Sequence, residues 1–133
     1  GHARDYVEMC WKILQYKKPD DFIVATGKQY SVKNFIEKCF KYLGIKIIWK
    51  GKGINEKGII KDFDKNKYPN LKEKMEVIRI SKKYFRPNEV DNLIGDSSKA
   101  KKLLNWKPKV SIDELVKEMM EEDLNIIKKK YLK

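Results

Sequence analysis

Residues 95–108 read Gly95-Asp96-Ser97-Ser98-Lys99-Ala100-Lys101-Lys102-Leu103-Leu104-Asn105-Trp106-Lys107-Pro108, and this stretch decides how the second half of the chain folds. Asp96 and Ser97 are both residue types that cap helix N-termini, so the sequence predicts a short helix from here through Leu104. The four residues that follow Leu104 end that helix, because the last of them is a proline. Trp106, the largest side chain of the stretch, is expected to fill the core.

The first part of the chain alternates helix-like and strand-like patterns. Apolar residues repeat at helical spacing over residues 4–17. Residues 22–27 are an uninterrupted apolar run closed by glycine, which is typical of a central parallel strand. A second helix is predicted from an N-cap at Ser31 to a left-handed C-cap at Gly44, and residues 46–49 form a short strand. This order of helix, strand, helix and strand indicates an α/β architecture.

The other segments are less regular. Residues 50–75 are rich in lysine and glycine and are predicted to form a long loop or insertion with at most one weak helical turn. Residues 76–80 alternate as a strand does. Ser111 and Glu114 form a capping box that opens a final helix, in which Met119 and its neighbour are expected to fill the core.

Composition narrows the function classes. The chain has 133 residues, is 41% hydrophobic and carries a formal net charge of +12, but only three of its 31 basic residues are arginines. Because base readout and bidentate phosphate contacts rely on arginine, the charge is interpreted mainly as a solvated surface, and nucleic acid is disfavoured as a partner. Residues 46–83 hold the one regional concentration, twelve basic residues against five acidic ones. No apolar run is long enough for a membrane span.

The cysteines and the single histidine offer little chemistry. Cys10 and Cys39 lack the spacing of a metal site, which favours two buried free thiols in a reducing cytoplasm. No metal site is therefore predicted. His2 stands at the start of the chain, and no Ser-His-Asp set or working pair of carboxylates can be assembled around it.

One constellation is typical of a binding site, and it lies in Phe85-Arg86-Pro87-Asn88-Glu89-Val90-Asp91. The planar fork of Arg86 suits a diphosphate, because it donates two parallel hydrogen bonds to phosphate oxygens. Glu89 would then accept hydrogen bonds from a ribose or hold the arginine in place. From composition alone, a loop salt bridge is an equal alternative. Trp49 and Lys50, at a strand end, are a second candidate lining of a cleft, although Trp49 is more often a core residue.

Several segments together resemble the C-terminal portion of the GDP-mannose 4,6-dehydratase family, within the extended short-chain dehydrogenases/reductases. The resemblance covers nearly the whole chain, starting at Gly1. It is carried by Gly1-His2-Ala3-Arg4-Asp5-Tyr6-Val7-Glu8, Pro19-Asp20-Asp21-Phe22-Ile23-Val24-Ala25-Thr26-Gly27, Tyr84-Phe85-Arg86-Pro87-Asn88-Glu89-Val90-Asp91, Gly95-Asp96 with Lys99-Ala100, Leu104-Asn105-Trp106-Lys107-Pro108 and Asp113-Glu114-Leu115-Val116. The Arg-Pro-x-Glu-Val-Asp string is characteristic of this family.

The resemblance implies a fold and a domain organisation. Residues 1–133 are expected to be the C-terminal sugar-nucleotide-binding portion of such an enzyme. The expected class is α/β, with a few strands and about four helices and without most of the Rossmann sheet. Residues 1–45 would include elements that complete the Rossmann domain, and residues 50–75 would be the long lysine-rich loop or insertion. An unpaired strand in this first part predicts self-association or partial disorder near residues 1–30.

The resemblance also implies an activity. The family converts GDP-mannose to GDP-4-keto-6-deoxy-mannose, the precursor of GDP-fucose, as a cytoplasmic lyase with bound NADP. The cofactor site and the catalytic residues are expected in the missing N-terminal domain, so this chain alone is predicted to be inactive. Arg86 is expected at the diphosphate and Glu89 near the ribose, and the full-length enzyme is expected to be a homo-oligomer.

Two alternatives stay open. The first is a stand-alone basic module that binds nucleic acid or another polyanion, and it depends on the net charge and on residues 46–83. The second is a piece of a related dehydratase or epimerase that acts on another nucleotide sugar.

Overall fold

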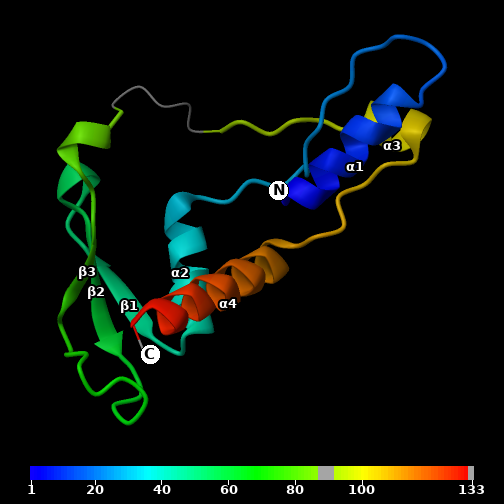
Figure 1. Ribbon diagram of the computed structural model, residues 1–133. Coiled ribbons are helices and arrows are strands. Elements are labelled where there is room, and N and C mark those ends of the chain that lie inside the picture. Colours follow the sequence, from blue (N-terminus) through cyan, green and yellow to red (C-terminus); the bar gives the residue numbers. More distant parts are fainter. Residues whose placement is uncertain (87–91, 132–133) are drawn as a thin grey trace. The chain divides into compact units, whose positions relative to one another are not determined.

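The computed structural model describes residues 1–86 and 92–131 (Figure 1). Their elements, in chain order, are α1 (Ala3–Leu14), α2 (Val32–Tyr42), β1 (Lys46–Lys50), η1 (Gly53–Asn55), β2 (Lys57–Asp62), β3 (Glu76–Arg79), η2 (Lys82–Tyr84), α3 (Ser98–Leu104) and α4 (Ile112–Tyr131). Four α-helices and one three-stranded sheet among the described residues confirm an α/β composition. These residues form two compact units, residues 32–86 and residues 1–31 with 92–131.

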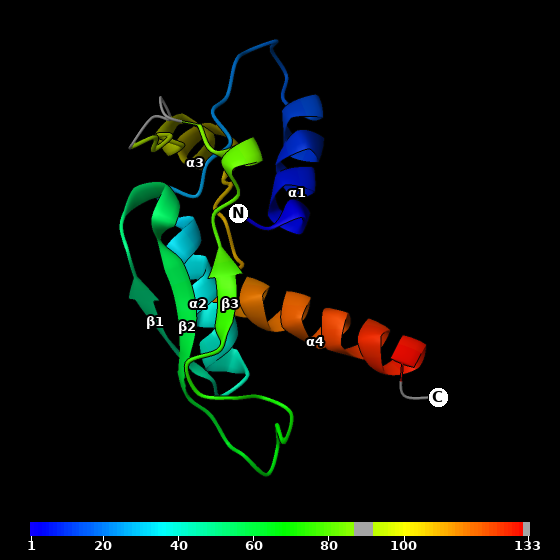
Figure 2. The ribbon, with the colours of Figure 1, turned by 90° about the vertical axis from the view of Figure 1, so that its left-hand side faces the viewer.

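The unit of residues 32–86 is a three-stranded sheet with a helix packed on it. The strands run antiparallel in the order β1-β2-β3, as Figure 2 shows. Ile45, Ile60 and Phe63 are buried between the sheet and α2, and Phe40 and Leu43 pack against them from the helix end. The apolar side of the amphipathic helix α2 thus covers one face of the sheet.

Helix α2 is followed by the left-handed C-cap that the sequence predicts at Gly44. Gly44 has a φ of +76°, the left-handed conformation that glycine adopts at low cost. Its N–H donates to the Lys41 carbonyl at 3.0 Å, and the Ile45 N–H donates to the Phe40 carbonyl at 2.9 Å. This pair of bonds is the Schellman motif, and the packing of Ile45 in the same cluster as Phe40 supplies its hydrophobic contact. The chain therefore turns directly from α2 into β1.

The other unit is built around Trp106. Its core consists of Met9 from α1, Ala100 from α3 and Trp106, which is 1% exposed. Phe22 and Val24 from the segment after α1 pack against this core. The prediction that Trp106 fills the core is therefore confirmed.

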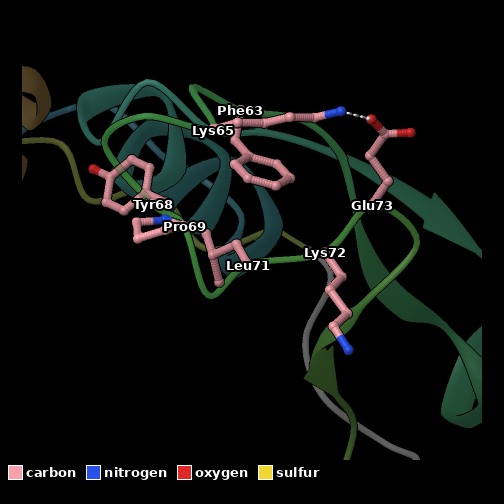
Figure 3. Close-up of a pocket in the computed structure, with 7 residues that line it drawn as sticks. All are labelled: Phe63, Lys65, Tyr68, Pro69, Leu71, Lys72 and Glu73. Carbon is pink, nitrogen blue, oxygen red and sulfur yellow. Dashed lines mark ion pairs between the residues drawn. The ribbon is translucent and has the colours of Figure 1, made fainter.

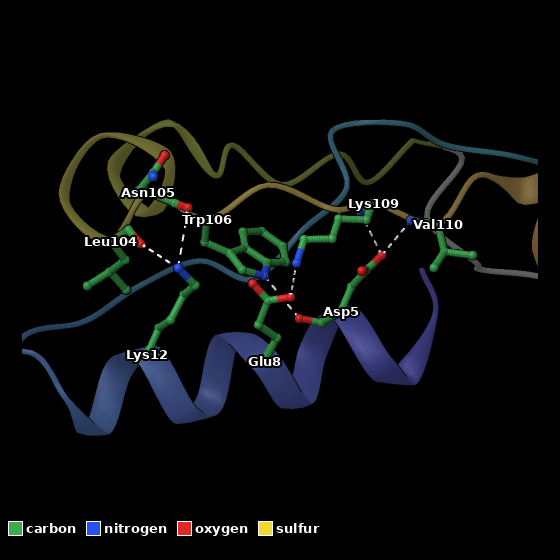
Figure 4. Close-up of polar contacts among 8 residues, drawn as sticks. All are labelled: Asp5, Glu8, Lys12, Leu104, Asn105, Trp106, Lys109 and Val110. Atoms are coloured by element: carbon green, nitrogen blue, oxygen red, sulfur yellow. Dashed lines mark hydrogen bonds and ion pairs between the residues drawn. The ribbon is translucent and has the colours of Figure 1, made fainter.

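A buried carboxylate fixes the segment that carries Trp106. Asp5 is 2% exposed, and its Oδ2 accepts hydrogen bonds from the backbone N–H groups of Lys109 and Val110 at 3.1 and 3.0 Å (Figure 4). Its carbonyl oxygen accepts a bond from Trp106 Nε1 at 3.0 Å. Lys12 donates to the Leu104 carbonyl at 3.1 Å, which adds a second tie between α1 and the end of α3. Two N–H donors offset much of the cost of burying the carboxylate.

The helix boundaries in and after residues 95–108 agree with the caps predicted from the sequence. Asp96 accepts a bond from the Ser98 N–H at 2.9 Å, and Ser97 is the N-cap of α3. Asn105 ends α3 in the left-handed conformation with a φ of 47°. At the start of α4, Glu114 accepts from the Ser111 N–H at 2.7 Å, and the Glu114 N–H donates to Ser111 Oγ at 3.2 Å. The predicted capping box is confirmed.

Two secondary-structure predictions are wrong. Residues 22–27 are not a strand, because no segment of the described chain pairs with them, and a strand exists only through its ladder. Residues 50–75 are not one long loop, because residues 57–62 form β2, the central strand of the sheet. The single weak helical turn expected there is present as η1.

Two burial predictions are also wrong. Cys10 is exposed on α1 and Cys39 is half-buried on α2, although both are free thiols. Met119 is 44% exposed, so it does not fill the core as expected. None of the described helices is both long enough and apolar enough to cross a membrane.

The burial of Trp106 gives the first prediction. Trp106→Ala removes a fully buried indole and leaves a cavity, so it is expected to destabilise its unit by about 3–5 kcal/mol. The matched control is Trp11→Ala, because Trp11 is 62% exposed and its truncation is expected to stay within about 0.5 kcal/mol. Urea unfolding followed by far-ultraviolet circular dichroism measures both. An equal loss of unfolding free energy in the two variants would show that the core does not depend on Trp106.

Candidate functional site

The predicted binding arginine, Arg86, is placed by the end of the sheet. β3 ends at Arg79, and the short helix η2 follows it and leads to Arg86. Figures 1 and 2 show η2 at the end of β3 where β1 finishes and β2 begins. The Arg86 side chain is exposed, and no other described residue bonds to it. Glu89, its predicted partner, lies outside the described residues.

The same end of the sheet carries a row of three cations. Lys50 is paired in register with Lys57, and Lys57 is paired with Arg79. Residues directly opposite each other share one face of a sheet, so these three side chains lie side by side across the three strands. Like charges in this position repel one another. We call Lys50, Lys57 and Arg79 the basic row.

One carboxylate partly neutralises the basic row. Glu76 accepts a hydrogen bond from Lys57 Nζ at 2.9 Å and another from Arg79 Nε at 2.6 Å. Lys57 first and Arg79 second hold the pKa of Glu76 below its usual range, because both hydrogen bonds favour the charged form. Three cations against one anion leave a net positive charge at this edge, which suits an anionic ligand.

Trp49 belongs to a different face. Its Nε1 donates to Glu37 Oε1 on α2 at 2.8 Å, and Lys33 Nζ lies 4.8 Å from the ring centroid. Lys33 also pairs with Glu56 at 2.7 Å. Because successive strand residues point to opposite faces, Trp49 and Lys50 cannot line one cleft together. The hypothesis of a shared Trp49 and Lys50 lining is therefore wrong, and Trp49 is packed on α2.

A hollow of about 300 Å³ lies at the opposite end of the sheet, in the segment between β2 and β3. Figure 3 shows its lining, which consists of Phe63, Lys65, Tyr68, Pro69, Leu71, Lys72 and Glu73. Lys65 is paired with Glu73 at 3.2 Å, and the Lys72 side chain points away from the Phe63 ring (Figure 3). The Tyr68 hydroxyl donates to the Leu43 carbonyl at 2.8 Å. Few polar groups are left to recognise a ligand, so this hollow is a weaker candidate than the basic row.

The described residues do not form a histidine-based catalytic set or a metal site. His2 caps α1 by accepting a bond from the Arg4 N–H at 3.0 Å, and its Nε2 lies 3.3 Å from Glu118 Oε1. No group of three or more His, Cys, Asp or Glu side chains in the described part of the chain is placed to hold a metal ion.

Sequence reasoning missed Lys57 and Arg79 as site residues, because Lys57 fell in a predicted loop. A signal was present at Gly58. A Cβ on Gly58 would lie 2.9 Å from Ile78 Cβ, so this glycine permits close packing of two strands. Glycine in this position is compatible with a strand interior, although glycine-rich segments more often form loops.

Comparison with known proteins gives one consistent picture. A family model described as GDP-mannose 4,6 dehydratase matches residues 1–119. Similar proteins include the GDP-mannose 4,6-dehydratase of Vibrio cholerae, 48% identical over 126 residues, which covers 95% of this chain and 34% of that protein. The human GDP-mannose 4,6 dehydratase is 45% identical over 96% of this chain and 32% of its own length, and that of Dictyostelium discoideum is 47% identical over 96% and 33%. The chain spans about a third of the length of these relatives.

The ion pairs of Glu76 give the second prediction. A carboxylate whose pKa is lowered in the folded state stabilises that state above its unfolded pKa, which is about 4.3 for Glu, and this stabilisation is lost as the pH falls through the folded pKa. Between about pH 6 and pH 3, the unfolding midpoint of the natural chain is therefore expected to fall further than that of Glu76→Gln. Thermal unfolding at both pH values measures the difference. The Glu122→Gln variant controls for the loss of one carboxylate, and parallel curves for all three proteins would contradict the prediction.

Proposed function

The chain belongs to the GDP-mannose 4,6-dehydratase family, and on that premise we propose that it is the C-terminal, sugar-nucleotide-binding third of such an enzyme. The whole enzyme would convert GDP-mannose to GDP-4-keto-6-deoxy-mannose. This third would hold the GDP-sugar, and the catalytic residues would lie in the part of the enzyme outside this chain. Alone, the chain would bind its ligand without turning it over.

The observation that carries the proposal is the position of Arg86. Its guanidinium is exposed and unpaired with any described carboxylate, and it follows the strand that ends in the basic row. A diphosphate carries two adjacent anionic groups, and Arg86 can bind one of them through its two parallel N–H groups. The net positive charge of Lys50, Lys57, Arg79 and Glu76 attracts the ligand to this end of the sheet. Glu89 is proposed to contact the ribose.

The cofactor of the family is proposed to bind elsewhere in the enzyme. A dinucleotide site of the Rossmann type needs a strand, a glycine-rich turn and a helix, in that order, so that the pyrophosphate meets the helix N-terminus. In the described residues, Gly44 follows a helix and precedes a strand, and Gly51 and Gly53 connect two antiparallel strands. These residues do not fit NADP.

The remaining properties of the proposal all derive from the family resemblance. The full-length enzyme is proposed to be a lyase of the extended short-chain dehydrogenase/reductase type that supplies GDP-fucose synthesis. It is proposed to act in the cytoplasm and to assemble as a homo-oligomer.

The proposal predicts that Arg86→Ala weakens binding of GDP-mannose. The loss of charged hydrogen bonds costs about 1.5–3 kcal/mol, which corresponds to a roughly 10- to 150-fold higher Kd. Arg86→Lys keeps the charge but loses the fork, so its Kd is expected to lie between those of the natural chain and Arg86→Ala. Arg4→Ala, in the other unit, is the matched control with an unchanged Kd. Isothermal titration calorimetry of the 133-residue chain measures all four proteins.

The same titration distinguishes the alternatives. Equal binding of GDP-mannose and UDP-glucose would favour a related enzyme with another sugar nucleotide. An unchanged Kd in Arg86→Ala would remove Arg86 from the site. Tight binding of DNA at physiological salt, without binding of GDP-mannose, would favour the polyanion-binding module instead.

A further inference from the structure

The segment between β2 and β3 is a compact loop that starts and ends on the same strand. Residues 63–75 continue directly from β2 and return to it at Met75, whose carbonyl accepts a hydrogen bond from the Ile60 N–H at 3.0 Å. The Lys74 N–H donates to the Ile60 carbonyl at 2.9 Å. A surface loop of this length whose ends lie close together is an Ω-loop, a class that is frequently functional.

The hollow of about 300 Å³ in this loop has an apolar floor that is fixed to the core. Phe63 is 9% exposed and belongs to the same buried cluster as Ile60, and Tyr68 and Leu71 pack against that cluster. The bond from the Tyr68 hydroxyl to the Leu43 carbonyl holds the tyrosine ring in place. Figure 3 shows these side chains around the hollow. The cavity is therefore formed in the free chain, so little entropy is lost when it is filled.

The carboxylates in and beside this loop already have partners. Asp62 pairs with Lys46 at 3.3 Å, and Glu73 pairs with Lys65 at 3.2 Å. Asp64 accepts hydrogen bonds from the backbone N–H groups of residues 66 and 67 at 2.9 and 3.3 Å. None of these three carboxylates is left to neutralise the other lysines of the loop.

Four lysines around the hollow therefore keep an uncompensated positive charge. Lys61, Lys67, Lys72 and Lys74 are exposed, and no described carboxylate pairs with any of them. The Lys67 Nζ lies 5.2 Å from the Tyr68 ring centroid. Lys72 lines the hollow, and its side chain points away from the Phe63 ring, so its ammonium group is free to meet a ligand at the rim (Figure 3). An apolar hollow is thus surrounded by positive charge.

We propose that this hollow is a docking site for an acidic peptide segment of another protein. One aromatic or aliphatic side chain of the segment fills the hollow, and its flanking carboxylates pair with Lys67 and Lys72. Charge complementarity selects this occupant, because the floor offers contacts to an apolar group and the rim attracts an anion. The site is independent of sugar-nucleotide binding, since it shares no residue with the basic row or with Arg86.

The burial of the floor disfavours a membrane or a nucleic acid as the occupant. Among residues 63–75, Met75 is the one large apolar side chain that is exposed, at 45%, so the loop offers little to insert into lipid. Single-stranded nucleic acid stacks its bases on exposed aromatic rings, whereas Phe63 is buried in the floor. A concave apolar surface fits a single protruding side chain better than either of these partners.

The test titrates a defined probe into the isotope-labelled 133-residue chain. The probe is the pentapeptide acetyl-Glu-Asp-Phe-Asp-Glu-amide, and backbone amide shifts are followed by two-dimensional nuclear magnetic resonance. At millimolar peptide, shift changes are expected in residues 61–75. One control peptide has glycine in place of phenylalanine, and the other has the corresponding amides in place of its acidic residues. Each is expected to bind about tenfold more weakly or less tightly still, because it lacks either the anchor or the charge.

A pair of variants tests the lysines at the rim. Lys67→Gln combined with Lys72→Gln is expected to raise the Kd of the probe about fivefold or more, through the loss of two charge pairs. The matched control combines Lys17→Gln with Lys18→Gln, which are exposed in the other unit and remove the same charge. This control is expected to leave the Kd unchanged. The peptide controls need no substitution in the protein, so they do not depend on the folding of a variant.

Four results would overturn the proposal. The first is the absence of shift changes in residues 61–75 at millimolar probe. Equal binding of the glycine peptide would show that no side chain enters the hollow, and equal weakening by the control pair would show attraction by net charge alone. Shifts that depend on protein concentration without peptide, together with a dimer mass in sedimentation, would make a second copy of this chain the occupant. Binding of GDP-mannose is titrated separately, so its failure does not bear on this site.

Discussion

The buried carboxylate of Asp5 is the constraint on which its unit depends. Burial of an unpaired carboxylate at 2% exposure would cost free energy, but Asp5 Oδ2 accepts hydrogen bonds from the backbone N–H groups of residues 109 and 110. The backbone carbonyl of Asp5 accepts a hydrogen bond from the indole N–H of Trp106. Partners more than 100 positions apart in the sequence are thereby joined to the first helix. Because the polar groups of Asp5 and Trp106 satisfy one another, the indole can be buried against Met9 and Ala100 without an unpaired donor.

Features that depend on local chemistry could be predicted from the sequence. The capping box at Ser111, the left-handed turn at Gly44 and the break at Asn105 each involve backbone groups within a few residues. The amphipathic spacing of α1 and α2 follows from the apolar pattern along a single helix. In these cases, the residues that form the interaction are close together in the sequence, so its outcome does not depend on the rest of the fold.

Features that depend on a distant partner could not be predicted in this way. The apolar run at residues 22–27 looks like a strand, but strand formation needs a second segment, and the described chain does not supply one. Conversely, residues 57–62 look like a loop because of Gly58, yet they pair on both sides, and that glycine makes room for Ile78.

The candidate site depends both on a local sequence motif and on the long-range pairing of strands. Arg86 was identified from a local motif, whereas Lys57 and Arg79 enter only through the pairing of three strands. The pairing places like charges opposite one another, and Glu76 offsets only part of their repulsion. A bound diphosphate would provide the missing negative charge, so the arrangement that is unfavourable in the free chain becomes favourable in the complex. The excess of positive charge at this end of the sheet is the physical argument for the proposal that an anion binds where the family motif begins.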